Sequence, residues 1–162
     1  MDANQTAGEG LTLMKRVGYW LPVVAMILVM FGFSTDAFSG ENTQGIIVRL
    51  IRWLGLDPNS RAALRINFAL RKLAHLTEYA VLAALVYRAF RSGRHPRWRA
   101  RWAAESMAIV VVWALMDEYH QSLTETRTGS IYDSLIDMAG GLIALAVIYR
   151  VSLSQQKKDD FA

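Results

Sequence analysis

Ionisable side chains gather in three short segments of this sequence, each joined to a long apolar run. The segments read RKLAHLTEY at residues 71–79, MDEYHQ at 116–121 and RTGSIYDSLID at 127–137. Histidine beside carboxylates can act as an acid or a base near neutral pH, while lysine and arginine bind phosphate or carboxylate groups. These residue types therefore favour a site that holds an anion and moves protons.

Helical spacing would bring these side chains onto common faces, because residues three, four and seven positions apart lie on one side of a helix. Burying an ionised group in a bilayer costs about 2.5–3.5 kcal/mol, so we expect the groups to face the interior of a helical bundle and to pair there. The three sets are Lys72, His75 and Tyr79 with Glu78 at their flank, Asp117, His120 and Gln121 with Glu118 beside them, and Asp133 with Asp137.

Simpler roles stay open for some of these residues. Lys72 can extend its charge to lipid headgroups without binding a ligand. His75 and Glu78 can form a pair that only stabilises helix packing. A carboxylate-lined pathway for ions or protons is a further alternative, which the confinement of the charges to one end of each apolar run disfavours.

Several kinds of chemistry are disfavoured by what the sequence lacks. The chain has no cysteine, and Ser122, Thr124 and Ser130 lie in no nucleophile motif such as G-x-S-x-G. It also has no Walker A loop. A metal site made of His75, His120 and an acid is possible, but the His-x-x-Glu spacing of His75 and Glu78 alone is weak evidence. We therefore predict no cofactor, and a metal ion stays possible without being predicted.

Composition indicates that a membrane surrounds the elements that carry these residues. The chain is 53% hydrophobic and 20% charged, with a mean hydropathy of +0.20. Four runs, at 17–33, 70–90, 101–121 and 131–150, are long enough to cross about 30 Å of hydrocarbon as helices. The predicted fold class is all-α, an integral membrane bundle of four transmembrane helices. The net charge of +4 is spread between the runs, so we predict membrane lipids and no nucleic acid as partners.

The distribution of arginine predicts the orientation of the bundle. The loop RSGRHPRWRAR at 91–101 contains five arginines and no acid, which is typical of a cytoplasmic loop. With four spans, both termini then lie inside, and the ionisable ends face outward from the cytoplasmic membrane. An aromatic belt is expected at the inner side, made of Tyr19, Trp20, Tyr87, Trp98, Trp102 and Tyr149.

The first outer loop holds a further amphipathic segment, GIIVRLIRWLG at 45–55. We interpret it as a short interfacial helix on the outer leaflet, with a packing helix of a soluble kind as the alternative. Asp57 and Pro58 are typical of a helix start, so the next helix is predicted to begin there. The chain is expected to form one domain over 1–162, with disordered tails at 1–14 and 153–162.

The three blocks together resemble the VanZ-like family of small membrane proteins, over about residues 15–150. The resemblance rests on RKLAHLTEYAVLAAL, on MDEYHQ, and on an R-x-G-S-x-x-D-x-x-x-D-x-x-G-G pattern that ends at Gly140 and Gly141. It implies a helical membrane bundle, and the family is named for an accessory protein of glycopeptide resistance associated with teicoplanin. The positions that match its motifs are Lys72, His75, Glu78, Tyr79, Asp117, Glu118, His120, Gln121, Arg127, Asp133 and Asp137.

Two functions are compatible with these residues. The first is hydrolysis or transfer on a cell-envelope lipid or lipid-linked phosphate, with His75 or His120 as the base and Lys72 and Arg127 holding the anion. Glu78, Asp117, Glu118, Asp133 and Asp137 would complete the catalytic set, and Tyr79 and Gln121 would contact the ligand. The second is a non-catalytic protein that sequesters or shields an envelope ligand. In either case we expect His120 to hydrogen-bond a carboxylate of Asp133, Asp137 or Glu78.

Overall fold

Four long helices make up most of the described chain in this computed structural model. They are α1 (Ala3–Ser34), α3 (Arg61–Arg91), α4 (Ala100–Ser122) and α5 (Ile131–Asp159). The structure describes residues 3–34, 48–49, 51–53, 55, 57–92, 97–122 and 131–159. All four predicted runs are helical, and so are residues 3–14 and 153–159, for which the sequence predicted disordered tails. These residues extend α1 and α5 without a break.

The start of α3 differs from the prediction by one turn. The Asp57 carboxylate accepts a hydrogen bond from the Asn59 amide at 2.9 Å, which closes a turn before the helix. Ser60 is the N-cap, and its hydroxyl accepts a hydrogen bond from the Ala63 amide at 3.1 Å. The helix therefore begins at Arg61. Within the predicted interfacial segment, the described residues 48–49 and 51–53 are helical.

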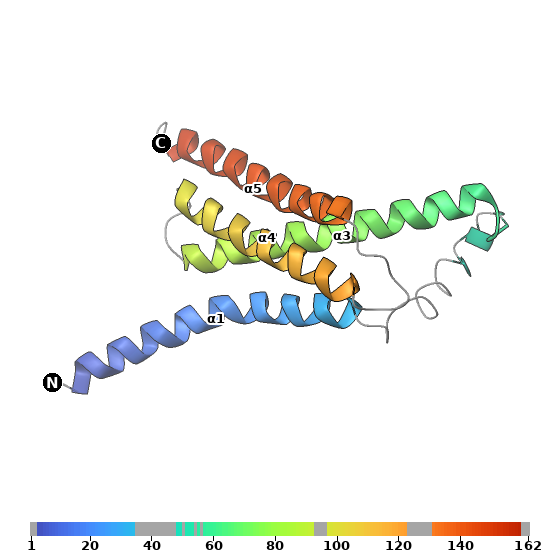
Figure 1. Ribbon diagram of the computed structural model, residues 1–162. Helices are drawn as coiled ribbons and strands as arrows, with labels where there is room; N and C mark the ends of the chain where they lie inside the picture. The colour runs from blue at the N-terminus through green and yellow to red at the C-terminus, as the bar shows by residue number, and fades with distance from the viewer. Residues whose placement is uncertain are drawn as a thin grey trace.

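The helices alternate in direction, so that the first and last described residues lie at the same end of the molecule (Figure 1). The most extensive packing is between α3 and α5, and α4 and α1 lie against this pair. The first part of α3 extends well beyond the other helices (Figure 1). The amino-terminal ends of α3 and α5 and the carboxyl-terminal end of α4 therefore point to one side.

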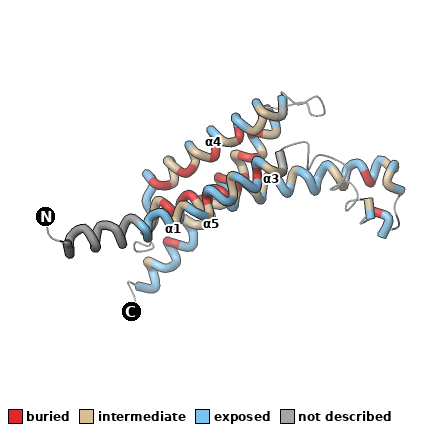
Figure 2. The backbone as a smooth tube through the Cα atoms, turned by 90° about the horizontal axis from the view of Figure 1, so that it is seen from below, coloured by how far each residue is buried: buried red, intermediate tan, exposed pale blue. Residues whose placement is uncertain are grey.

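The outside of the bundle carries many large apolar side chains, and its mostly apolar interior also buries a few polar ones. Large apolar side chains lie exposed along its outside, among them Leu21 at 68%, Leu28 at 64% and Leu142 at 57%. Polar side chains are fully or almost fully buried inside, including Ser106, Ser134 and Asp137. Figure 2 shows the exposed faces along the helices and the buried residues where they meet. Apolar side chains on the outside, with the few ionisable groups turned inward, are what a lipid environment favours.

Two of the helices are long and apolar enough to cross a membrane, over Met14–Gly32 and Tyr132–Asp159. Over the described residues, the other two helices of the predicted four-span bundle, α3 and α4, have no comparably apolar stretch. At 23 residues and about 1.5 Å per residue, α4 has the length of a span. The all-helical fold is thus confirmed, while four crossings remain a prediction.

An aromatic cluster packs the end of the bundle at which the described chain begins and ends. Tyr87 stacks on Trp98 at a centroid distance of 5.2 Å, and Trp98 meets Tyr149 edge-on at 5.2 Å. The Tyr87 hydroxyl accepts a hydrogen bond from the Arg99 amide at 3.1 Å. These contacts join α3, α4 and α5 through residues that the sequence assigned to one aromatic belt.

The closest approach between α3 and α5 occurs at Gly140. A Cβ atom there would lie 2.2 Å from the carbonyl oxygen of Leu76, a backbone atom that cannot move aside. At Gly141 a Cβ would meet the Val110 side chain at 3.0 Å, which can rotate. This glycine pair therefore permits close helix packing, most strictly at Gly140.

We predict that Gly140→Ala separates α3 from α5. Overpacking of this kind costs about 1–3 kcal/mol or more, so the melting temperature in detergent should fall by several degrees. Gly18→Ala is the matched control, because a Cβ at Gly18 meets nothing within 4 Å and alanine favours a helix. Equal melting temperatures for Gly140→Ala and Gly18→Ala would contradict the close approach.

Candidate functional site

Lys72 on α3 and Asp133 on α5 form an ion pair where these two helices meet. Their side chains are 15% and 19% exposed, so most of both charged groups is removed from solvent. The ammonium of Lys72 also lies 5.2 Å from the centre of the Phe68 ring, one turn earlier on α3. At the edge of the predicted ionisable cluster, the ammonium of Lys72 is therefore paired with the carboxylate of Asp133.

One turn further along both helices, His75 faces Asp137. The His75 Nδ1 lies 3.4 Å from the Asp137 Oδ1, and their side chains are 23% and 1% exposed. This is within ion-pair distance, but the atoms are not aligned for a hydrogen bond, and both carboxylate oxygens of Asp137 are buried without one. A carboxylate in this state is costly unless a cation or proton compensates it.

Asp117 on α4 joins these two residues. One ligand atom each from His75, Asp117 and Asp137 can be chosen so that all lie within 4.8 Å of one another. Glu78 is also close enough for its charge to act on His75. Three helices thus contribute to one cluster, as the sequence predicted.

Two buried hydroxyl groups of the bundle have no hydrogen-bond partner among the described residues. Tyr79 is 0% exposed and Ser134 is 1% exposed, and the Tyr79 Oη and Ser134 Oγ atoms both lack a partner. The sequence predicted Tyr79 as a residue that contacts the ligand, and the structure places it in the core of the bundle. Ser134 was not predicted, since a serine in a helix carries no sequence signal of its depth.

His120 occupies a different environment from the one expected. Its ring lies 5.3 Å from the ring of Phe31 on α1, and its Nδ1 is buried without a hydrogen-bond partner. Among the described residues, the histidine that approaches a carboxylate is His75 and not His120. The expected bond from His120 to Asp133, Asp137 or Glu78 is therefore wrong. Sequence spacing could not show that α1 lies against this end of α4.

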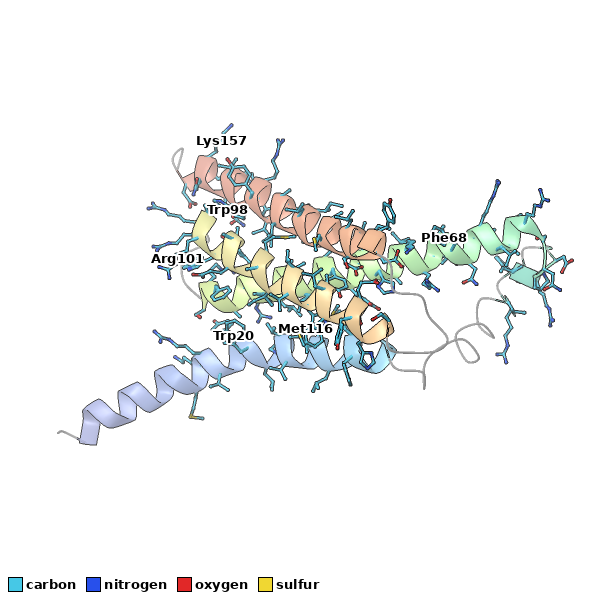
Figure 3. The ribbon with its side chains drawn as sticks, in the orientation of Figure 1. Trp20, Phe68, Trp98, Arg101, Met116 and Lys157 are labelled. Carbon is cyan, nitrogen blue, oxygen red and sulfur yellow. The ribbon has the colours of Figure 1, made fainter. Side chains whose placement is uncertain are left out.

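The structure describes only some of the remaining predicted site residues. Glu118 is half-buried beside Asp117 near the end of α4. Gln121 belongs to the last turn of α4, but its side chain lies outside the described residues, and Arg127 does so entirely. Figure 3 shows the two ends of the bundle, with Trp98 and Arg101 at one end of α4 and Met116 toward the other. The ionisable cluster lies at the Met116 end, because Asp117 follows directly.

An all-helical protein with two helices apolar enough to cross a membrane, and with an ionisable cluster between its helices, has the features of a membrane protein. Comparison with protein-family models adds a specific assignment, since the VanZ/LLP1 model matches residues 19–153. The chain therefore belongs to the VanZ/LLP1 family, and the match includes all the site residues named above. No curated protein and no solved structure matches the chain.

The burial of the Lys72–Asp133 pair predicts an asymmetric response to mutation. Lys72→Met leaves the Asp133 carboxylate partly buried and unpaired, which should cost about 3 kcal/mol and lower the melting temperature in detergent. The control is Arg101→Met, which removes the cation of the Arg101–Glu105 pair. Those side chains are 86% and 33% exposed, so the cost should stay below about 1 kcal/mol. Equal losses of stability in both variants would show that Lys72 and Asp133 are solvated and that their pair adds little to stability.

Proposed function

We propose that this protein binds a phosphate-bearing lipid or lipid-linked precursor of the cell envelope and processes it at the outer face of the membrane. The single observation that supports this most is the arrangement of two charge pairs one turn apart, Lys72 with Asp133 and His75 with Asp137. A cation and, one turn further along the same helix, a histidine are the two groups that binding and cleaving a phosphate ester require.

The two pairs have distinct roles in this proposal. Lys72 binds the phosphate, and Asp133 holds its ammonium in place when no ligand is bound. His75 directs Nδ1 toward Asp137, which leaves Nε2 to take a proton from the attacking water. Attack of the water on phosphorus breaks the P–O bond to the lipid alkoxide. The imidazolium that forms, stabilised by the Asp137 carboxylate, returns its proton to that leaving oxygen. Asp117 and Glu78 add negative charge around His75, which favours its protonated form during the reaction.

A second candidate function is a binder that shields an envelope ligand without changing it. The observation that favours this alternative is the burial of Asp137 and Tyr79, both 0% exposed. A lipid headgroup would therefore reach Lys72 first and would touch neither of these residues in the conformation described. The resemblance to an accessory protein of glycopeptide resistance is compatible with such a role.

The proposed orientation follows from arginine density and from the alternating helices. We predict that Ala100→Cys is labelled from the cytoplasm and Ser122→Cys from outside, because these exposed residues stand at opposite ends of α4. The natural chain has no cysteine, so each variant carries a single thiol. Membrane-impermeant maleimide on intact cells should label Ser122→Cys alone. The reverse pattern would place the cluster at the cytoplasmic face and end the envelope proposal.

Phosphate recognition can be tested with vesicles that contain phosphatidic acid, compared with pure phosphatidylcholine. The purified protein should prefer phosphatidic acid, and Lys72→Gln should weaken this preference about tenfold, which corresponds to about 1.4 kcal/mol for one charge-assisted contact. Lys72→Arg keeps the charge and should retain binding, which separates a lost contact from misfolding. An equal affinity of the wild-type protein for both vesicles would contradict the proposal.

The two candidate functions differ in the role of His75. If the protein is an enzyme, His75→Gln should keep phosphatidic acid binding while the release of inorganic phosphate falls by two orders of magnitude or more. If it is a binder, the wild-type protein should bind without any phosphate release, and His75→Gln should behave like the wild type. Folded protein, isolated by size-exclusion chromatography, is used for every variant.

A further inference from the structure

The deepest part of the cluster has an unusual electrostatic composition. Asp137 is 0% exposed, and both of its carboxylate oxygens lack a hydrogen-bond partner in the described part of the chain. The Nδ1 atom of His75 is likewise buried and without a hydrogen bond, although it faces Asp137 at 3.4 Å. His75 and Asp137 could hydrogen-bond each other, but their atoms are slightly too far apart and poorly aligned to do so.

Such a gap between a histidine and a carboxylate is what a shared ligand between them would leave. A buried carboxylate with no donor costs free energy, and this cost is removed when a cation lies between the groups. Asp117 supplies a third ligand atom, and the three atoms lie within 4.8 Å of one another. Ligand atoms bound at about 2.0–2.2 Å from one metal ion are somewhat closer than this, so small side-chain rotations would close the site.

We propose that His75, Asp117 and Asp137 bind a divalent transition-metal cation between α3, α4 and α5. The ligands are one imidazole nitrogen and two carboxylate oxygens, a mixed set that suits Zn²⁺ or Mn²⁺. Mg²⁺ and Ca²⁺ prefer oxygen ligands alone and larger coordination numbers, so they fit this set less well. Three protein ligands leave at least one position for water, as in catalytic sites and unlike closed structural ones.

Charge supports a cation at this position. Glu78 acts on His75 together with Asp117 and Asp137, so three carboxylates surround one imidazole. The nearby Lys72 is already paired with Asp133. A divalent cation bound by His75, Asp117 and Asp137 would offset the charge of two carboxylates, and Glu78 beside it could accept a hydrogen bond from metal-bound water.

This inference concerns the same site as the proposed function but does not require the lipid substrate. With a cation bound, His75 is a ligand and not the base, and a metal-bound water takes the place of the water that His75 would otherwise activate. Metal binding is therefore measured without any lipid. Its failure leaves phosphate recognition by Lys72 intact, and a failure of the lipid experiments leaves the metal site intact.

The test uses the full-length, tag-free protein in detergent, stripped with a chelator and dialysed against Zn²⁺, Mn²⁺, Mg²⁺ or Ca²⁺. Elemental analysis should find one Zn²⁺ or Mn²⁺ per chain and no stoichiometric Mg²⁺ or Ca²⁺. Asp137→Asn and His75→Gln should each weaken binding at least tenfold. Glu105→Gln is the matched control, since it removes an acid from the other end of α4 and should bind like the wild type.

X-ray absorption at the bound metal provides a second measurement that needs no variant. The wild-type spectrum should show nitrogen and oxygen neighbours with the outer-shell pattern of an imidazole. The proposal is overturned if the wild-type protein retains no stoichiometric transition metal, if the spectrum lacks imidazole, or if both ligand variants bind as tightly as Glu105→Gln. If the ligand variants do not fold, the stoichiometry and the wild-type spectrum decide the question.

Discussion

The close approach of α3 and α5 at Gly140 is the constraint on which the rest of the site depends. The Leu76 carbonyl oxygen occupies the space that a side chain at position 140 would need. Leu76 follows His75 directly, and Gly140 lies one turn after Asp137, so the point of contact is also the point where these two groups meet. Any separation of the helices would lengthen both the His75–Asp137 contact and the Lys72–Asp133 pair. The absence of a side chain at Gly140 thus sets the separation of α3 and α5, and with it the distances within the proposed site.

A lipid environment explains why such a polar centre can be stable in so small a bundle. Hydrophobic burial does not hold helices together when lipid already surrounds their apolar faces. Close backbone contact, aromatic packing at one end and ion pairs at the other then provide the cohesion. Tyr87 and Trp98 hold the end where the described chain begins and ends, while Lys72 and Asp133 hold the opposite end. A charged cluster of this kind would destabilise a soluble core. Here it contributes to cohesion and to the proposed function.

The sequence predicted the parts of this structure that depend on local pattern. Apolar length located the four helices, and helical spacing placed His75, Asp117 and Asp137 on faces that could converge. It could not predict which histidine meets which carboxylate, because that depends on helix rotation and on the position of α1. Phe31 packs against the ring of His120, and this contact between distant segments leaves no trace in the spacing of either. The burial of Tyr79 and Ser134 could not be predicted from the sequence for the same reason. The start of α3 could not be predicted to the residue either, because Asp57 and Ser60 are both residue types that cap helices. Only the structure shows that Asp57 closes a turn and that Ser60 is the cap.

The order of residues along α3 suggests how the two proposals fit into one site. Lys72 is 15% exposed in its side chain, His75 is 23% exposed, and Tyr79, one turn further, is fully buried. A phosphate headgroup that approaches from the protruding part of α3 would meet Phe68 and Lys72 before it meets His75. A cation held by His75 and the two aspartates would then lie beneath the phosphate, where it could bind a phosphate oxygen that Lys72 already orients. Because Lys72 and His75 lie on one helix face and their partners lie on one face of α5, a single rigid contact between two helices fixes the distance from the anion site to the cation site.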